Sequence, residues 1–366
     1  MPASPVQPIV IWFGRVGDMI LLSALLGILH RRYGGRCHLI GAGSWPAQLY
    51  AAHGDVARVT CLHRYTAFMF DGAWWRARAA LRRSRRDPVY VCEYDPRKLA
   101  RVQRLLHAGG TDPARCLFIT QTSCLRESHW VDRLMCFGRL TPPAFDAAAY
   151  PWVDTHSDLA SAPPPCAPHL TVAAAARADC AAWIGSQGWG GRPLVLVQPG
   201  NRRTMRGSRL RISSEDDKAW PIERWATLLH QVHAQLPQAV ILLCGAPREL
   251  RLLSWIKDAA QLPAVAAAEL PLPRLLALCE RAHSMISVDT GPAHAAASLS
   301  LPLVVMFGAH SQQEWLPRSP SGSPVIGVGG PPQSSRLDQV AVETVFEAWR
   351  ALERGLRPTT VRATAP

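Results

Sequence analysis

The 366-residue sequence lacks several features that would place it in a membrane or outside the cell. No uninterrupted apolar run approaches the roughly 20 residues that a membrane-spanning helix needs. No basic segment precedes the first short apolar run, and Arg15 and Asp18 follow it closely, so we expect no secretory signal peptide. The ten cysteines include no Cys-x-x-Cys pair, which argues against a zinc ribbon and predicts free thiols in a reducing compartment. These absences favour a cytoplasmic protein.

The N-terminal turn also lacks a motif. Gly14-Arg15-Val16-Gly17-Asp18 follows a short apolar strand candidate but does not contain G-x-G-x-x-G, the dinucleotide-binding fingerprint. A dehydrogenase is therefore disfavoured, although the strand–turn–helix pattern around this turn still predicts α/β structure.

Acidic residues are few compared with basic ones. The net charge is +13, and residues 1–150 carry 20 Lys and Arg against 10 Asp and Glu. A basic face of this kind attracts nucleic acid, anionic lipid headgroups or a phosphorylated glycolipid, but it can also be a plain solvated surface. The densest stretch contains Arg76, Arg78, Arg82, Arg83, Arg85, Arg86, Arg97, Lys98, Arg101 and Arg104.

The order of apolar segments predicts two α/β domains. Prolines crowd residues 151–170, which predicts a linker between a domain at 1–150 and a domain at 171–335, followed by a helix and tail at 336–366. The predicted strands are 9–13, 36–41, 89–93, 117–120, 194–198, 239–244, 284–288 and 303–307. The predicted helices are 19–32, 172–184, 222–235, 248–260, 273–280 and 337–355.

One segment, Ser287–His294, combines a buried strand, a Thr-Gly turn and the start of an Ala-rich helix. A helix N-terminus offers backbone N–H groups and positive potential, which suits a phosphate. Gly291 permits close approach of the ligand. The alternative is an ordinary turn in which Asp289 or Thr290 caps the helix.

Three segments together resemble the heptosyltransferase-type glycosyltransferases, glycosyltransferase family 9. Ile9–Tyr33 resembles the opening strand, Gly-Asp turn and first helix of that family. Gln198–Trp225 contains its Pro-Gly and Lys-x-Trp-Pro-x-x-x-Trp pattern, and Val288–Gly308 resembles its D-[ST]-G-x-x-H signature. The resemblance implies a GT-B fold, in which two Rossmann-like domains face each other across a cleft. It also implies an inverting transfer from ADP-heptose that needs no metal and no cofactor beyond the ADP-sugar substrate. The sequence has no Asp-x-Asp metal motif, in agreement with this, since Asp216 and Asp217 are adjacent.

The resemblance also assigns roles to single residues. Asp18 would be the general base that takes the proton of the acceptor hydroxyl, although it could instead cap the first helix. Lys218 would neutralise the leaving diphosphate, unless it is a solvated lysine before a helix. The remaining donor-site residues are predicted to be Thr204, Glu249, Leu270, Asp289, Thr290, Gly291 and His294. Predicted acceptor contacts are Arg15, Arg82, Arg83, Arg85 and Arg86.

One part of the chain departs from the family pattern. Residues 201–217 form a long, Arg-rich loop where the family has a short one. The sequence therefore does not decide which residues of this loop contact phosphate; the candidates are Arg202, Arg203, Thr204 and Arg206.

These features predict an enzyme that transfers a heptose to a lipopolysaccharide core or a related glycolipid. The expected partners are the nucleotide sugar and an anionic glycolipid, with peripheral contact at the cytoplasmic face of the inner membrane. One alternative keeps the fold and changes the donor sugar, or uses a protein or small-molecule acceptor. A basic nucleic-acid-binding protein is the other, but no nucleic-acid-binding motif supports it.

Overall fold

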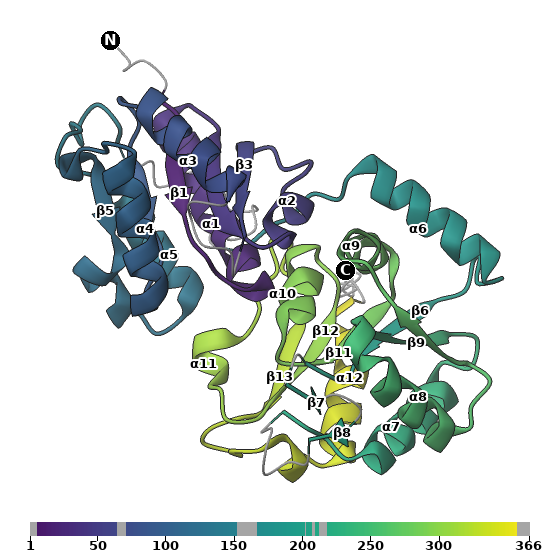
Figure 1. The fold of residues 1–366 in the computed structure, drawn as a ribbon. Coiled ribbons are helices and arrows are strands. Elements are labelled where there is room, and N and C mark those ends of the chain that lie inside the picture. Colours follow the sequence, from purple (N-terminus) through teal and green to yellow (C-terminus); the bar gives the residue numbers. More distant parts are fainter. Residues whose placement is uncertain are drawn as a thin grey trace, which may run out of the picture. The chain divides into compact units, whose positions relative to one another are not determined.

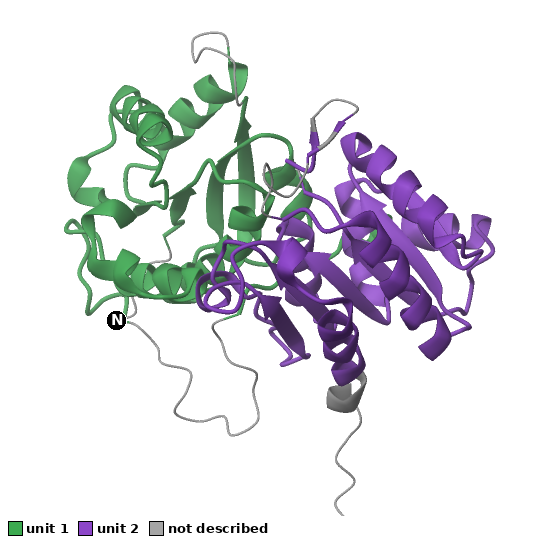
Figure 2. Cartoon of the chain, turned by 90° about the horizontal axis from the view of Figure 1, so that it is seen from below, with its two compact units in different colours: residues 1–177 green, residues 178–366 purple. Residues whose placement is uncertain are grey.

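The structure is a computed structural model that describes residues 6–63, 71–151, 167–201, 203–206, 209–211 and 218–356. The chain divides into two compact units, residues 1–177 and 178–366 (Figure 2). Each unit contains its own parallel β-sheet with helices packed on it (Figure 1).

The sheet of the first unit has the strand order β3-β2-β1-β4-β5, and every neighbouring pair is parallel. Valine, isoleucine and leucine dominate its central strands, as is typical of strands covered on both faces. The strands are β1 (Ile9–Ile11), β2 (Cys37–Ala42), β3 (Val56–Leu62), β4 (Val89–Val91) and β5 (Cys116–Phe118). The α-helices are α1 (Val16–Tyr33), α2 (Trp45–Leu49), α3 (Gly72–Arg83), α4 (Pro96–Ala108) and α5 (Trp130–Arg139), with short 3₁₀ turns at Pro113–Arg115, Ile119–Gln121 and Ser123–Arg126.

The second sheet has the order β10-β9-β6-β11-β12-β13, again fully parallel. Numbered within the unit, this is the 3-2-1-4-5-6 order of dinucleotide-binding folds. Its strands are β6 (Leu194–Gln198), β9 (Val240–Gly245), β10 (Val265–Glu269), β11 (Ser284–Val288), β12 (Leu303–Phe307) and β13 (Val325–Gly329), beside a small hairpin of β7 (Met205–Arg206) and β8 (Arg209–Leu210). The helices are α7 (Ile222–Gln235), α8 (Leu250–Ala260), α9 (Leu272–Arg281), α10 (Gly291–Ser298), α11 (Gln312–Trp315) and α12 (Val342–Leu356), with 3₁₀ turns at Pro247–Glu249 and Leu337–Gln339.

In both sheets the strand order reverses beside the first strand. The reversal lies between β1 and β4 in the first unit and between β6 and β11 in the second. Chains leave neighbouring strands in opposite directions there, so the carboxyl ends at this point are where parallel α/β sheets bind ligands.

Several predicted elements are confirmed to the residue, namely β6, β11, β12 and α7. The sequence analysis missed β3, β10 and β13 and the helices α3, α4 and α5. Helices α3 and α4 are rich in arginine, and their apolar residues form only a narrow stripe that packs on the sheet. The helical apolar pattern is therefore weak in the sequence. In β10 the run Val-Ala-Ala-Ala-Glu carries little β-propensity, so pairing with β9 decides its conformation.

The predicted linker falls mostly on residues 152–166, which lie outside the described residues. The division between the units passes through helix α6 (Ala174–Ser186). The predicted C-terminal helix is present as α12, which packs on α7, β12 and β13. Its Trp349 is fully buried and donates a hydrogen bond to Ser284 Oγ at 2.9 Å, so this helix is part of the second core.

The prediction that all cysteines are free thiols is wrong for one pair. Cys124 and Cys136, which are 12 positions apart in the sequence, are joined by a disulfide, and their Cα atoms lie 5.5 Å apart, a typical separation for a disulfide. Cys166 lies outside the described residues. The described free cysteines are Cys37, Cys61, Cys92, Cys116, Cys180, Cys244 and Cys279.

Every helix in the described part of the chain is too short or too polar to span a lipid bilayer.

Candidate functional site

In the second unit, a charged cluster lies at the carboxyl end of β11. Lys218 Nζ donates to Asp289 Oδ2 at 2.6 Å and to the Asp289 carbonyl oxygen at 2.8 Å. His310 Nδ1 lies 2.8 Å from the same carboxylate oxygen and donates to it, since a carboxylate only accepts. The side chains of Lys218 and Asp289 are 14% and 7% exposed, so this is a nearly buried ion pair.

The ionisation of Asp289 depends on these two partners. Burial alone would raise its pKa, but the hydrogen bond from His310 and the charge of Lys218 outweigh burial and hold the pKa at about 2. At neutral pH the carboxylate therefore fixes the ammonium group of Lys218 at the edge of the sheet.

Helix α10 begins directly after this cluster. Thr290 is its N-cap residue, but the Thr290 side chain makes no capping hydrogen bond and donates instead to the Val288 carbonyl at 3.1 Å. The Asp289 carboxylate is held by Lys218 and His310 rather than by the helix. Thr290 therefore stands at the N-cap position, as the alternative expected, but neither its side chain nor that of Asp289 caps the helix. Gly291 opens the helix, and His294, one turn later, is buried at 5% exposure.

A second carboxylate lies at the ends of β6 and β9. Glu249 is 6% exposed, and its Oε2 accepts the Ala246 N–H at 2.8 Å. Its Oε1 lies against Gly200, where a Cβ would come within 2.6 Å of it. Among the described residues none donates a well-formed hydrogen bond to Oε1, although the Gln198 side-chain amide, which donates to the Gly200 carbonyl at 3.0 Å, lies near enough to act on the Glu249 carboxylate. Burial raises the pKa of Glu249.

Two other predicted donor residues are tied to the backbone. The N–H of Leu270 donates to the Gly245 carbonyl at 3.1 Å, so its carbonyl and buried side chain are what a ligand could meet. Thr204 is buried, and its Oγ1 accepts the Asn201 N–H at 2.8 Å, closing the turn before the β7–β8 hairpin. Arg203 is exposed there. Arg202, the Arg206 side chain and residues 212–217 lie outside the described residues.

In the first unit, Asp18 lies at the carboxyl end of β1, in the first turn of α1. Its Oδ2 accepts the Arg15 N–H at 2.7 Å, so its capping role is present. Gly14 leaves room for the Asp18 side chain, since a Cβ at position 14 would lie 2.6 Å from the Asp18 Cβ. The exposed Arg15 side chain begins the same turn.

The sequence analysis missed the groups beside Asp18. Glu93, directly after β4, accepts the N–H of Phe13 at 3.1 Å and that of Asp95 at 3.0 Å, and burial raises its pKa. Tyr94, whose pKa is raised to about 12 by burial and by the Asp18 charge, packs on Trp130. A signal for Glu93 and Tyr94 was present in the sequence: a carboxylate and an aromatic residue follow β4, the strand that neighbours β1.

The four arginines predicted as acceptor contacts do not join this edge. Arg82 and Arg83 end α3, and Arg85 and Arg86 follow just before β4 begins, so they lie at the amino ends of the strands. Their neighbourhood confirms it, because the Arg83 charge lowers the pKa of His38 at the start of β2. Their role as acceptor contacts stays a prediction, while α3, which runs antiparallel to the strands, carries its C-terminus to the edge opposite Asp18.

Two residues from the later part of the basic stretch, Lys98 and Arg101, lie at the same edge of the sheet as Asp18. Lys98 and Arg101 are in the first two turns of α4, directly after β4. The Arg101 guanidinium lies over the Phe13 ring at 5.8 Å, and the Lys98 charge acts on Glu93.

Known proteins resemble this chain both in sequence and in fold. Residues 168–338, which hold every predicted donor residue, match the model of glycosyltransferase family 9 (heptosyltransferase). By this match, the segment is similar to glycosyltransferase family 9. The resemblance inferred from the sequence is thus confirmed.

A stretch of 131 residues is 28% identical to lipopolysaccharide heptosyltransferase 3 of Escherichia coli and covers 35% of this chain. The same stretch spans about a third of that relative, 35% of its length.

Solved structures extend the likeness to the whole fold. A glycosyltransferase of family 9 from Veillonella parvula superposes with a TM-score of 0.73 at 15% identity, over 97% of this chain and 99% of its own. The Escherichia coli ADP-heptose LPS heptosyltransferase II gives 0.68 at 17% identity, over 96% and 99%. The predicted GT-B fold is confirmed.

The Lys218–Asp289 pair makes a pH-dependent contribution to stability that can be measured. Because the pKa of Asp289 is depressed in the folded state, its contribution is complete above the ordinary Asp pKa of about 4 and is lost as pH falls toward 2. Lys218→Gln should lower the free energy of unfolding by about 2 kcal/mol at pH 7, and this difference should shrink between pH 4 and pH 2. Urea unfolding followed by circular dichroism measures both.

The matched control for this experiment is Lys257→Gln, which changes an exposed lysine of α8. This variant should leave the free energy of unfolding unchanged both at pH 7 and at pH 2. A Lys218→Gln effect of constant size from pH 7 to pH 2 would contradict the pairing with Asp289.

Proposed function

We propose that this chain is an inverting, metal-independent glycosyltransferase that moves a heptose from ADP-heptose to a lipopolysaccharide core or a related cell-envelope glycolipid. The observation that carries the proposal is the Lys218–Asp289 pair at the N-terminus of α10, inside a segment similar to glycosyltransferase family 9. The names of the relatives support the donor and acceptor class.

The diphosphate of the donor would bind between Lys218 and the first turn of α10. There the amide of Gly291 and the positive helix end favour a phosphate, and Thr290 adds a hydroxyl. As the sugar–phosphate bond breaks, negative charge grows on the departing ADP. A fixed ammonium group stabilises that charge without any reorganisation during the reaction, which is the contribution a metal ion makes elsewhere. Asp289 and His294 would contact sugar hydroxyls or phosphate.

The nucleoside would extend from the phosphates toward β9 and β10. The buried Oε1 of Glu249 is an acceptor that a pair of ribose hydroxyls can satisfy, and Gly200 leaves the space for the ribose to approach. Leu270 would offer its carbonyl and its side chain to the adenine. Thr204 holds the turn beside this site.

Asp18 would act as the general base. The acceptor hydroxyl attacks the anomeric carbon from the side opposite the diphosphate, its proton passes to Asp18, and ADP leaves with the bonding electron pair. One displacement of this kind inverts the anomeric centre. The hydrogen bond from the Arg15 amide fixes the orientation of the carboxylate, so capping and catalysis use the same geometry. Lys98 and Arg101 supply positive charge near the acceptor.

Asp18→Asn tests the assignment of the base. It should lower kcat for transfer from ADP-heptose to a deacylated lipopolysaccharide core by about 10²–10⁴-fold, while calorimetric ADP affinity stays unchanged. Asp132→Asn, which changes another first-turn carboxylate in the same unit, is the control and should leave kcat near wild type. Equal loss of transfer, ADP binding and thermal stability in the Asp18 variant would mean that Asp18 is only structural.

The arginines at the opposite edge fit a different role. Arg82, Arg83, Arg85 and Arg86 are all exposed, and Trp75 on the same helix is 48% exposed. Exposed arginines at the end of a helix that also carries an exposed indole suit the headgroup region of an anionic membrane. We propose that this surface brings the enzyme to the membrane that holds its glycolipid acceptor.

Changing these four arginines to glutamine should weaken binding to phosphatidylglycerol-containing vesicles at least tenfold, since each arginine contributes about 1 kcal/mol. Binding to neutral vesicles, and kcat with a soluble acceptor, should not change. The control removes the same charge from exposed positions of the second unit: Arg248, Arg251, Lys257 and Arg281. Vesicle co-sedimentation that falls equally for both variants would show that net charge alone drives binding.

A further inference from the structure

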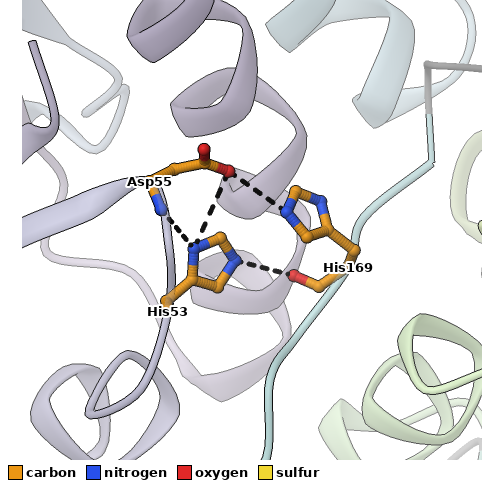
Figure 3. A group of neighbouring side chains, drawn as sticks. All are labelled: His53, Asp55 and His169. Carbon is orange, nitrogen blue, oxygen red and sulfur yellow. Dashed lines mark hydrogen bonds and ion pairs between the residues drawn. The ribbon is translucent and has the colours of Figure 1, made fainter.

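A cluster of titratable side chains lies in the first unit that the proposed transfer does not use. Asp55 lies just before β3, and His53 is two residues earlier (Figure 3). His169 reaches them from a segment 116 residues farther along the chain. His53 Nδ1, one oxygen of Asp55 and His169 Nε2 all lie within 4.8 Å of one another.

The ring of His53 is fixed in one tautomer. Its Nε2 lies 3.0 Å from the His169 carbonyl oxygen, so Nε2 carries the proton and donates it. Nδ1 is then the lone-pair nitrogen and accepts the N–H of Asp55 at 3.3 Å, a long hydrogen bond that a bound ion would replace. The side chain is fully buried. A histidine that donates one ring N–H to a carbonyl and turns its other nitrogen toward a carboxylate has the arrangement of a metal ligand.

The carboxylate is oriented as well. Asp55 Oδ1 accepts from His30 Nδ1 at 2.7 Å, which leaves Oδ2 facing both other histidines. Oδ2 lies 3.1 Å from His169 Nε2 and 3.8 Å from His53 Nδ1. His30 thus supports the carboxylate from outside the group, as second-layer partners do at metal centres.

The backbone around the cluster holds these groups close together. Ser23 Oγ on α1 accepts the N–H of His169 at 2.9 Å. One turn later, Gly27 leaves the space, since a Cβ there would lie 3.1 Å from Asp55 Oδ2 and 3.4 Å from His169 Cε1. The side chain of His169 is 40% exposed and that of Asp55 is 17% exposed, which opens a path from solvent.

We propose that His53, Asp55 and His169 bind a Zn²⁺ ion. A tetrahedral zinc ion holds its ligands at about 2.0–2.1 Å, so neighbouring ligand atoms lie roughly 3.3 Å apart. The two separations from Asp55 Oδ2, 3.1 and 3.8 Å, bracket this value. All three ligand atoms lie within 4.8 Å of one another, so a bound ion would draw the two histidines slightly closer together. Two imidazoles and one carboxylate suit zinc better than magnesium or calcium, which prefer all-oxygen sites. Water completes the fourth position, and the proton between His169 Nε2 and Asp55 is released on binding.

The role of this ion is structural. Asp18 and His30 are separated by 12 residues of α1, or roughly 18 Å along the helix, so the ion lies far from the proposed base. It fastens the segment at 167–173 to the start of β3. The cysteine pattern gave no sign of it because no ligand is a cysteine, and His169 lies 114 residues from Asp55 in the sequence.

The test is calorimetric titration of chelator-treated protein with ZnCl₂. Wild type should bind one Zn²⁺ per chain with a Kd of about 1 μM or tighter, and the melting temperature should rise on binding. His169→Gln, at a half-exposed position that should not disturb folding, should weaken binding at least tenfold. His107→Gln, which changes an exposed histidine of α4, is the control and should bind like wild type.

Co²⁺ provides a second measurement that does not depend on stability. Bound at this site it should show the intense visible absorption of tetrahedral nitrogen and oxygen ligation, and His169→Gln should lose that absorption. Absence of saturable one-to-one binding by wild type would overturn the proposal. So would Zn²⁺ affinity that is the same in wild type and His169→Gln. Neither result bears on nucleotide binding by the second unit.

Discussion

The parallel arrangement of strands is the constraint on which the rest of this structure depends. Each parallel strand must be followed by a helix that returns the chain, so everything directly after a strand gathers at one edge and everything directly before a strand gathers at the other. Asp18, Glu93, Asp289 and Glu249 come from segments that follow strands, and each lies at a carboxyl edge. The zinc-site candidates and the four exposed arginines lie at the amino edge for the same reason. One topological rule therefore divides the first unit into a chemical edge and a supporting edge.

Within the second unit, the pair of Lys218 and Asp289 links fold to chemistry. A nearly buried ammonium ion is stable only beside a compensating charge, and Asp289 provides it together with a carbonyl oxygen. The same contact directs Lys218 to the N-terminus of α10, where backbone amides already favour an anion. An incoming diphosphate would then meet two sources of positive potential that were in place before it arrived. Preorganisation of this kind is what the proposed stabilisation of a leaving diphosphate requires in a domain without a metal motif.

Much of the second unit was predictable from sequence, because strands such as Leu194–Gln198 and Ser284–Val288 are continuous apolar runs bounded by turns. The position of Asp289 followed from the motif, but its partner His310 did not, since nothing local in Ala309-His310 marks it. That contact exists only because β12 pairs with β11. The edge of the sheet on which each basic residue lies did not follow from the sequence, for the converse reason. Arg82 and Lys98 look alike as members of one basic run, yet a strand between them sends one to each edge. Register and direction, which are tertiary properties, decide such cases.

The central claim is that the second unit holds an adenine nucleotide through its diphosphate. The most direct test is calorimetric binding of ADP, UDP and GDP to the full chain without added divalent metal, repeated with Lys218→Ala. The account predicts that ADP binds best and that the variant loses at least tenfold in ADP affinity, because the fixed ammonium group is gone. Tighter binding of UDP or GDP, or ADP binding that the variant leaves unchanged, would contradict it.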